Sequence, residues 1–530
     1  MRIVCHASTG KDSDKILPAL GCRLQVRFWL VLTRNGSIIP AMFSNKVYER
    51  ARLSRDARFD GQFFIGVRTT GIYCRPICPA NTPNSENVTF FPSAAAAGEA
   101  GYRPCLRCRP ECAPGTPAWN GTSTTVRRGL RLIEEGVLDG GSVETLADRL
   151  GVTSRHLRRL FSRHLGAGPQ AIAHTQRLHF AKRLIDQTTL PMQEIAIAAG
   201  YGSVRRFNDA FVNTYGRSPR ELRRGNDKQA STGEQFTVTL PVSKPFNWQV
   251  LCAFFGPRGI PGVETVIDNR YLRTVLIDGK PGIIELCHVD DSVALTLHGV
   301  PTSVLFPVVQ RCRALFDLDA PVREICSVLA ENALLKKRLK IHPGIRVPGA
   351  WDGFELTVRA VLGQQVSVKA ATTLAGRIAI RYGQPIPGSL AAVAKNSALT
   401  HTFPEPERLA NARFNDLGLI GARAESIRQV ARAVADGNLR FDLSQDPEIF
   451  RETFLGIRGI GDWTEQYVSM RALKNPDAFP ASDLGLLRAF DQKDKPRMKP
   501  AHLEEISQAW RPWRAYAALL LWSPAPGSGG

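Results

Sequence analysis

Long apolar runs are what this chain of 530 residues most plainly lacks. No stretch of about eighteen consecutive apolar residues occurs, so the sequence predicts no membrane-spanning helix. The short apolar segment FWLVL at 28–32 is followed by no small-residue cleavage site, which excludes an ordinary secretory signal. We therefore expect a cytoplasmic protein without a membrane partner.

Acidic residues are also scarce relative to basic ones. The chain has 48 Asp and Glu against 69 Lys and Arg, a formal net charge of +21. Such an excess favours a polyanionic partner, most simply nucleic acid, although a ribosome or an anionic membrane surface would fit the charge alone. The length predicts several domains, each with its own core.

The 11 cysteines of the chain favour a metal site or reactive thiols over a disulfide framework in a cytoplasmic protein. Cys74 and Cys78 form one short pair, and Cys105 and Cys108 form a second. Two such pairs separated by a folded segment are what a tetrahedral Zn²⁺ site requires, so we predict one zinc ion on these four residues. Whether the site only holds the fold or also reacts stays open from the spacing. Cys112 lies outside the pattern.

Two helix-turn-helix patterns follow a Pro/Gly-rich stretch at 113–121. The first runs from Ser142 through a helix ending at Gly151 into a second helix, and the second begins near 192. Basic residues gather near the start of each second helix, where they face phosphates or base edges in known motifs. The alternative is a solvated basic face. We predict DNA contacts from Arg155, Arg158, Arg159, Arg205 and Arg206.

The stretch 454–486 combines features that suit chemistry on a nucleobase in DNA. Gly456, Gly459 and Gly461 precede a helix predicted over 462–473, and backbone amides before a helix start bind phosphate. Trp463 and Tyr467 follow at i and i+4, hence on one helix face. A Pro-bounded loop then leads to Asp483. Taken singly, the glycines could be a plain turn and the aromatic pair plain core.

This stretch resembles the helix-hairpin-helix base-excision glycosylases, most closely the AlkA-type 3-methyladenine branch, through the spacing from Trp463 to Asp483. The resemblance implies that Asp483 is the catalytic carboxylate and that Gly456, Gly459 and Gly461 bind the DNA backbone. It also implies a base pocket and a wedge that fills the gap left by an extruded base. The pocket residues are Trp463, Tyr467, Trp522 and Gln364, and the wedge is Gln365.

Two details refine the activity that this resemblance implies. Relatives that also cleave the strand carry lysine where this chain has Trp463, which favours a monofunctional glycosylase. No cysteine follows Cys326, which excludes the iron–sulfur cluster of some relatives.

The zinc-site segment has a resemblance of its own. RFDGQFFIGVRTTGIYCRPICPANTP and YRPCLRCRPE look like the zinc domain of the Ada regulators, which implies that Cys74 accepts a methyl group from a methylated DNA phosphate. The two helix-turn-helix units resemble the AraC-type module. FNW and PGVETV lie in a segment that also holds alternating β-type runs at 271–277, 283–288 and 292–297, and they resemble the N-terminal domain of AlkA-type glycosylases.

The predicted fold is therefore multidomain, joining a small α+β zinc domain, an all-α AraC-type module, an α+β AlkA N-terminal-type domain and an all-α helix-hairpin-helix domain. The expected boundaries are a disordered leader at 1–42, with Met42 as a candidate natural start, then 43–118, 122–226, 235–345 and 346–523.

The predicted function is excision of alkylated purines by a nucleoid-associated monomer, coupled to sensing of methylated phosphates. Its partners are alkylated duplex DNA and promoter sites. A transcriptional regulator with an inert glycosylase half is the alternative. A guanine-alkyl transferase is excluded because no Pro-Cys-His-Arg tetrapeptide occurs.

Overall fold

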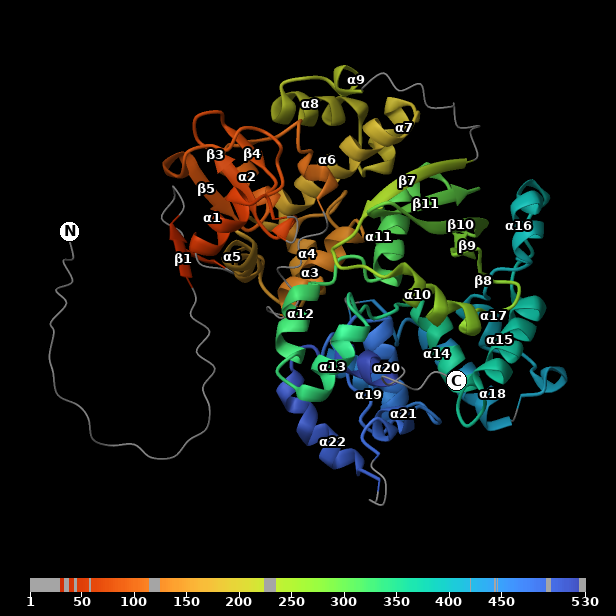
Figure 1. Cartoon of the computed structure of the whole chain (residues 1–530). Coiled ribbons are helices and arrows are strands. Elements are labelled where there is room, and N and C mark those ends of the chain that lie inside the picture. The colour runs from red at the N-terminus through yellow and green to blue at the C-terminus, as the bar shows by residue number, and fades with distance from the viewer. Residues whose placement is uncertain are drawn as a thin grey trace, which may run out of the picture.

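The computed structural model places four domains in sequence order (Figure 1). Among the residues that the structure describes, no helix is both long and apolar enough to cross a membrane. The described residues are 29–32, 38–41, 45–56, 59–113, 124–223, 235–419, 421–442, 445, 447–491 and 497–523.

The leader predicted to be disordered contains two short strands, β1 (Trp29–Leu32) and β2 (Ile38–Ala41). They pair in antiparallel register, so backbone hydrogen bonding orders a segment in which the sequence shows no clear periodicity. The remaining residues of 1–42, Met42 included, lie outside the described residues.

The first domain is built on a four-stranded sheet in the order β5-β3-β4-β6. Strand β4 ends at Cys74, and β6 pairs beside it in parallel and leads directly into Cys105. This pairing brings the two predicted cysteine pairs to one edge of the sheet. The elements are α1 (Asn45–Leu53), β3 (Phe64–Val67), β4 (Ile72–Cys74), β5 (Val88–Phe91), α2 (Ala94–Glu99) and β6 (Arg103–Pro104).

The second domain is all helical and contains both predicted helix-turn-helix units. The side chains of Ser142, Thr153 and Ser203 accept backbone N–H groups at the starts of α4, α5 and α8. Gly166 and Gly216 end α5 and α8 in the left-handed conformation. The helices are α3 (Thr124–Glu134), α4 (Val143–Arg149), α5 (Ser154–Leu165), α6 (Pro169–Gln187), α7 (Met192–Ala198), α8 (Val204–Tyr215) and α9 (Pro219–Leu222).

The third domain is a five-stranded antiparallel sheet, ordered β7-β11-β10-β9-β8, with helices α10 to α13. The predicted alternating runs at 271–277, 283–288 and 292–297 coincide with three of its strands. The elements are β7 (Gln235–Pro241), α10 (Trp248–Phe255), β8 (Glu264–Ile267), β9 (Arg270–Ile277), β10 (Lys280–Val289), β11 (Ser292–His298), α11 (Leu305–Leu315), α12 (Val322–Leu329) and α13 (Ala333–Ile341).

The fourth domain is built from helices, as predicted. Helices α19 and α20 flank the turn that holds Gly456, Gly459 and Gly461, called the hairpin below, and α20 confirms the helix predicted after it. The helices are α14 (Gly353–Leu362), α15 (Val368–Tyr382), α16 (Ala391–Ser397), α17 (Pro406–Leu409), α18 (Gly421–Ala435), α19 (Pro447–Leu455), α20 (Asp462–Arg471), α21 (Leu484–Arg488), α22 (Pro500–Ser507) and α23 (Arg514–Trp522).

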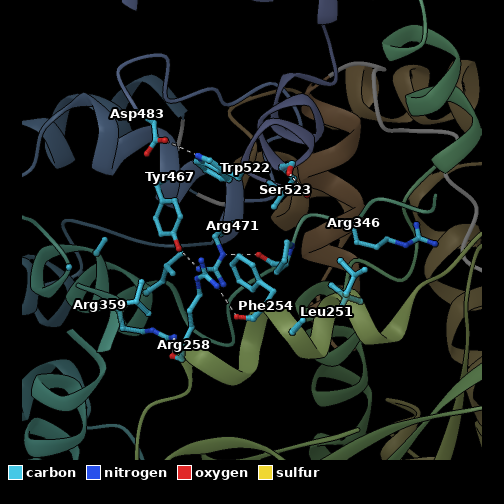
Figure 2. Close-up of a pocket in the computed structure, with 18 of the residues that line it drawn as sticks. Leu251, Phe254, Arg258, Arg346, Arg359, Tyr467, Arg471, Asp483, Trp522 and Ser523 are labelled. Carbon is cyan, nitrogen blue, oxygen red and sulfur yellow. Dashed lines mark hydrogen bonds between the residues drawn. The ribbon is translucent and has the colours of Figure 1, made fainter. Parts of the chain in front are cut away.

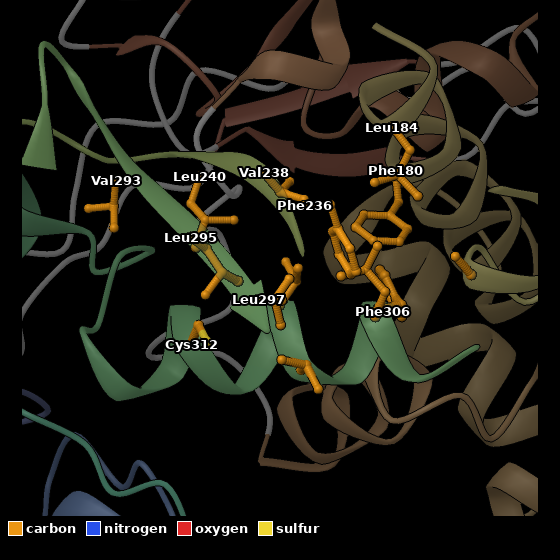
Figure 3. Close-up of a cluster of buried hydrophobic side chains, with 14 of the residues drawn as sticks. Phe180, Leu184, Phe236, Val238, Leu240, Val293, Leu295, Leu297, Phe306 and Cys312 are labelled. Carbon is orange, nitrogen blue, oxygen red and sulfur yellow. The ribbon is translucent and has the colours of Figure 1, made fainter. Parts of the chain in front are cut away.

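Helix α6 packs the N-terminal half of the protein (residues 45–223) against the C-terminal half (residues 235–523). Phe180 and Leu184 on α6 belong to the same buried cluster as Phe236 on β7 and Phe306 on α11 (Figure 3). The rings of Phe180 and Phe306 lie 5.0 Å apart, centre to centre, in an edge-on arrangement. The two halves therefore share a hydrophobic core, which the polar sequence NDKQASTGE at 226–234, typical of a linker, does not predict.

Candidate active site and metal centre

Asp483 lies where the loop after α20 meets α21, and three donors hold its carboxylate. One oxygen accepts the indole N–H of Trp522 at 2.7 Å and the backbone N–H of Leu486 at 3.0 Å. The other accepts the indole N–H of Trp463 at 2.8 Å. An indole N–H can only donate, so the two aromatic side chains fix the plane of the carboxylate between them. Figure 2 shows the contact of Asp483 with Trp522.

Trp463 and Tyr467 stack on one face of α20, with ring centres 5.0 Å apart and planes 10° from parallel. The ring of Trp522 approaches Tyr467 from the side, at 6.5 Å and 65°. Arg471, one turn further along α20, donates to the Tyr467 hydroxyl and to the carbonyls of Pro348 and Gly349. The three predicted aromatic residues thus lie together beside Asp483.

The charge around the Tyr467 hydroxyl is mainly positive. Burial alone raises the pKa of this hydroxyl, but the nearby guanidinium groups of Arg471, Arg359 and Arg258 outweigh burial and hold the pKa below its ordinary value. Arg258 belongs to the third domain and the other two arginines belong to the fourth. The part of the site around the Tyr467 hydroxyl, where the two domains meet, is therefore electropositive.

Asp483 and its aromatic neighbours open onto a cavity of about 780 Å³ between the third and fourth domains. Helix α10 of the third domain supplies Leu251 and Phe254 to the cavity wall, and Arg258 follows just after it. The Arg258 guanidinium lies 4.2 Å from the centre of the Phe254 ring, and that of Arg471 lies 4.9 Å from it.

Phe254 and Arg258 were not predicted, since no site residue was expected in the third domain. A signal for Phe254 was present. Helix α10 buries Trp248, Leu251, Cys252 and Phe255 at helical spacing, and Phe254 falls off that face. A large aromatic residue beside an apolar helix face indicates a second surface for it to cover.

The three predicted backbone-binding glycines lie at exposed positions in the turn before α20. Gly459 has φ of +91°, and a Cβ there would lie 2.3 Å from the Ser426 hydroxyl. Only glycine suits both the conformation and the space. Gly461 is the residue immediately before the first turn of α20, where free backbone N–H groups gather.

Gln364, which the resemblance assigns to the base pocket, lies beside the turn that holds Gly459. Its side-chain amide donates to the carbonyl of Gly459 at 2.8 Å, and it is not among the residues that line the cavity. This hydrogen bond ties the loop after α14 to the turn before α20. Gln365 is exposed and adopts φ of +56°, a left-handed conformation that costs a non-glycine residue about 1–2 kcal/mol.

The predicted zinc ligands come together at the edge of the first sheet. The sulfurs of Cys74, Cys78, Cys105 and Cys108 all lie within 4.8 Å of one another, with Cys78 and Cys105 4.0 Å apart. Four sulfurs at about 2.3 Å from one tetrahedral ion are about 3.8 Å from each other, so this set fits zinc. The backbone N–H of Arg75 points at the Cys108 sulfur, 3.3 Å away.

Two side-chain contacts hold the cysteine cluster of the first domain against helix α6 of the second domain. The Tyr73 hydroxyl, next to Cys74 in sequence, lies 2.9 Å from the Nε2 atom of His179. Arg109 pairs with Asp186. Burial lowers the pKa of His179 to about 3, with neighbouring cations adding to the effect, so this imidazole is neutral at physiological pH.

All five arginines predicted to contact DNA are exposed on α5 and α8. Arg158 pairs with Glu144 at 2.9 Å, and Arg205 is 4.0 Å from Asp209. Exposed pairs of this kind contribute little to stability, so phosphates can replace these carboxylates at small cost. Helix α6 separates the two helix-turn-helix units.

Known families match four segments of the chain in this order. Residues 48–111 match the metal binding domain of Ada, and residues 146–225 match a helix-turn-helix domain. Residues 237–352 match the AlkA N-terminal domain, and residues 358–515 match the HhH-GPD superfamily of base excision DNA repair proteins.

Individual relatives cover the same parts. A protein of Mycobacterium tuberculosis, described as a probable bifunctional transcriptional activator/DNA repair enzyme AlkA, is 41% identical over 479 residues, covering 89% of this chain and 95% of its own. The DNA-3-methyladenine glycosylase 2 of Escherichia coli is 33% identical over 54% of this chain and 96% of its own. The bifunctional transcriptional activator/DNA repair enzyme Ada of the same organism is 33% identical over 34% of this chain and 49% of its own.

These matches confirm the resemblances on which the predicted fold and function rest. The chain belongs to the family of bifunctional proteins in which Ada-type metal-binding and helix-turn-helix domains are joined to an AlkA-type DNA repair glycosylase.

Proposed function

We propose that the C-terminal half hydrolyses the N-glycosidic bond of alkylated purines, 3-methyladenine among them, in duplex DNA, with Asp483 as the catalytic carboxylate. The observation that carries this proposal is the contact of both Asp483 oxygens with indole N–H groups from two walls of one cavity. A carboxylate that only caps a helix needs no such aromatic frame.

The target nucleotide must leave the base stack before its glycosidic bond can be reached. The hairpin amides between Gly456 and Gly461 hold a phosphate of the damaged strand, and Gln365 fills the gap that the extruded base leaves. An N-alkylated purine carries a positive charge, so it stacks on Trp463, Tyr467 and Trp522 by cation–π attraction.

Bond cleavage follows from that charge. The bond between C1′ and the purine nitrogen breaks with its electron pair going to the base, which leaves as a neutral purine. The sugar becomes oxocarbenium-like, and the negative charge of Asp483 stabilises it. A water oxygen then bonds to C1′ and loses a proton to Asp483 or to solvent.

The absence of an amine in the site supports a monofunctional enzyme. Strand cleavage by relatives of this kind proceeds through an imine with a lysine side chain. Among the described residues that line the cavity, none is a lysine, and Trp463 stands where the strand-cleaving relatives carry one. Water is therefore the nucleophile.

For the first domain we propose that Cys74 accepts a methyl group from a methyl phosphotriester in DNA. One zinc ion, held by Cys74, Cys78, Cys105 and Cys108, would keep these sulfurs as thiolates, the nucleophilic form. The Cys74 sulfur forms the new bond to the methyl carbon while the methyl C–O bond breaks. The phosphate oxygen keeps the electron pair, which restores a diester anion. The helix-turn-helix units then bind promoter DNA.

One experiment separates the two activities. The full chain is incubated with methylated duplex DNA, the free bases are measured, and methylated cysteines are located by peptide mass. Release of 3-methyladenine together with methylation at Cys74 is expected. A transcriptional regulator with an inert C-terminal half would become methylated at Cys74 but would release no base. Methylation at another cysteine would refute the assignment of Cys74.

A further inference from the structure

We propose that Arg338 is a positioning residue for base excision, holding the end of α23 so that Trp522 keeps its contact with Asp483. This role rests on the proposed function, since Arg338 itself touches neither base nor sugar. The residue lies on α13, in the third domain, and its side chain reaches the helix that carries one wall of the cavity.

Arg338 is buried, with 4% of its surface exposed. Its guanidinium donates to the carbonyls of Leu520 at 2.9 Å and Leu521 at 3.3 Å, and also to that of Ser523. The last carbonyls of a helix have no partner within the helix, and they carry partial negative charge. One cation thus satisfies the end of α23.

The end of α23 is the functional part of that helix. Trp522 is its last residue, and the indole of Trp522 donates to Asp483 at 2.7 Å. Contacts therefore run without a break from Arg338 through the final turn of α23 to the carboxylate. If the final turn frays, the indole loses its place and Asp483 loses one of its three donors.

The choice of arginine at this position points to a role beyond packing. Helix α13 buries Leu335 and Arg338 on the face toward α23, while Lys336 and Lys337 are exposed. A leucine at 338 would continue the apolar face without the cost of burying a charge. Within the described part of the chain Arg338 forms no ion pair, so the carbonyls of α23 are its partners.

The test compares Arg338→Met with Lys337→Met, which removes an exposed cation from the next position of the same helix. Single-turnover release of 3-methyladenine should fall tenfold or more in Arg338→Met, and Lys337→Met should stay within twofold of the parent. Affinity for duplex DNA with an abasic site, which has no base to stack on Trp522, should change less than twofold in both.

Two further measurements distinguish positioning from general damage. In protein labelled with ¹⁵N-tryptophan, the indole N–H resonance of Trp522, assigned with Trp522→Phe, should move in Arg338→Met and not in Lys337→Met. In a double-mutant cycle, Arg338→Met should cause less than a twofold further loss of rate when Trp522→Ala is already present, because both changes disable the same wall. Arg338→Lys, which keeps a donor to the carbonyls, should fall between Arg338→Met and the parent.

An unmoved Trp522 resonance, or losses that multiply in the double variant, would overturn the proposal. If Arg338→Met does not fold, the resonance and rate of Arg338→Lys decide in the same way. A parent protein that releases no base would contradict the proposed function alone, because the indole resonance still reports whether Arg338 holds Trp522.

Discussion

Replacing Phe180 by alanine tests whether the two halves of the protein form one stable unit. Phe180 is fully buried, its ring lies 5.0 Å from that of Phe306, and the Arg183 guanidinium lies 5.6 Å from its centre. Truncating a buried phenylalanine costs about 3–5 kcal/mol of unfolding free energy, since it removes apolar contacts and leaves a cavity. The loss falls on both halves, because α6 belongs to one and α11 to the other.

Hydrogen exchange followed by mass spectrometry locates that loss. In Phe180→Ala we expect faster exchange in α6 and also in β7, β11 and α11, across the shared core. Leu157→Ala is the matched control, because Leu157 is equally buried but belongs to a separate cluster whose residues all lie in the N-terminal half. Its effect should stay in α3 to α6. Unchanged exchange in β7, β11 and α11 of Phe180→Ala would show that the halves are independent.

Two other changes probe the site and the domain contact. A Cβ at Gly485 would lie 2.9 Å from the Asp483 carboxylate and 3.0 Å from the Trp522 ring. Gly485→Ala should therefore lower the rate of single-turnover base release tenfold or more, whereas Gly388→Ala, at a position with open space around it, should not lower it. Equal rates in the two variants would contradict the frame around Asp483. Burial holds the pKa of His179 at about 3, below that of an unfolded chain, so stability is lost as pH falls below about 6.5. His179→Gln should remove up to about 1.4 kcal/mol of that loss per pH unit, measured by denaturant unfolding, and an identical pH profile in both proteins would refute the role of His179.

Local patterns made much of the active site predictable from sequence. The i and i+4 spacing places Trp463 and Tyr467 on one face whatever surrounds the helix. Asp483 is an N-cap, a position fixed by its neighbours in sequence. The same reasoning could not orient Gln364, because residue type says nothing about which acceptor a flexible amide finds. The carbonyl of Gly459, far along the chain, decides it.

Contacts between domains were the part that sequence patterns did not reveal. Phe254 and Arg258 reach the cavity only because α10 packs against the fourth domain. The docking of the two halves left a trace in α6, where Phe180, Leu184 and Ile185 spread apolar surface beyond one face. A helix that is apolar on more than one side is buried on more than one side. The second partner of such a helix is a domain that lies later in the sequence.

Single-turnover release of 3-methyladenine by Asp483→Asn tests the central claim most directly. Asparagine keeps the size of the side chain but removes the charge, and its NH₂ group faces one of the two indole N–H donors instead of accepting from it. The rate should fall about 100- to 1000-fold, the usual cost of losing one electrostatic contact to the transition state, while affinity for alkylated duplex DNA is retained. Asp491→Asn, at an exposed carboxylate paired with Arg497, is the control and should leave the rate unchanged. Base release by Asp483→Asn at the parental rate would contradict the assignment of Asp483 as the catalytic carboxylate.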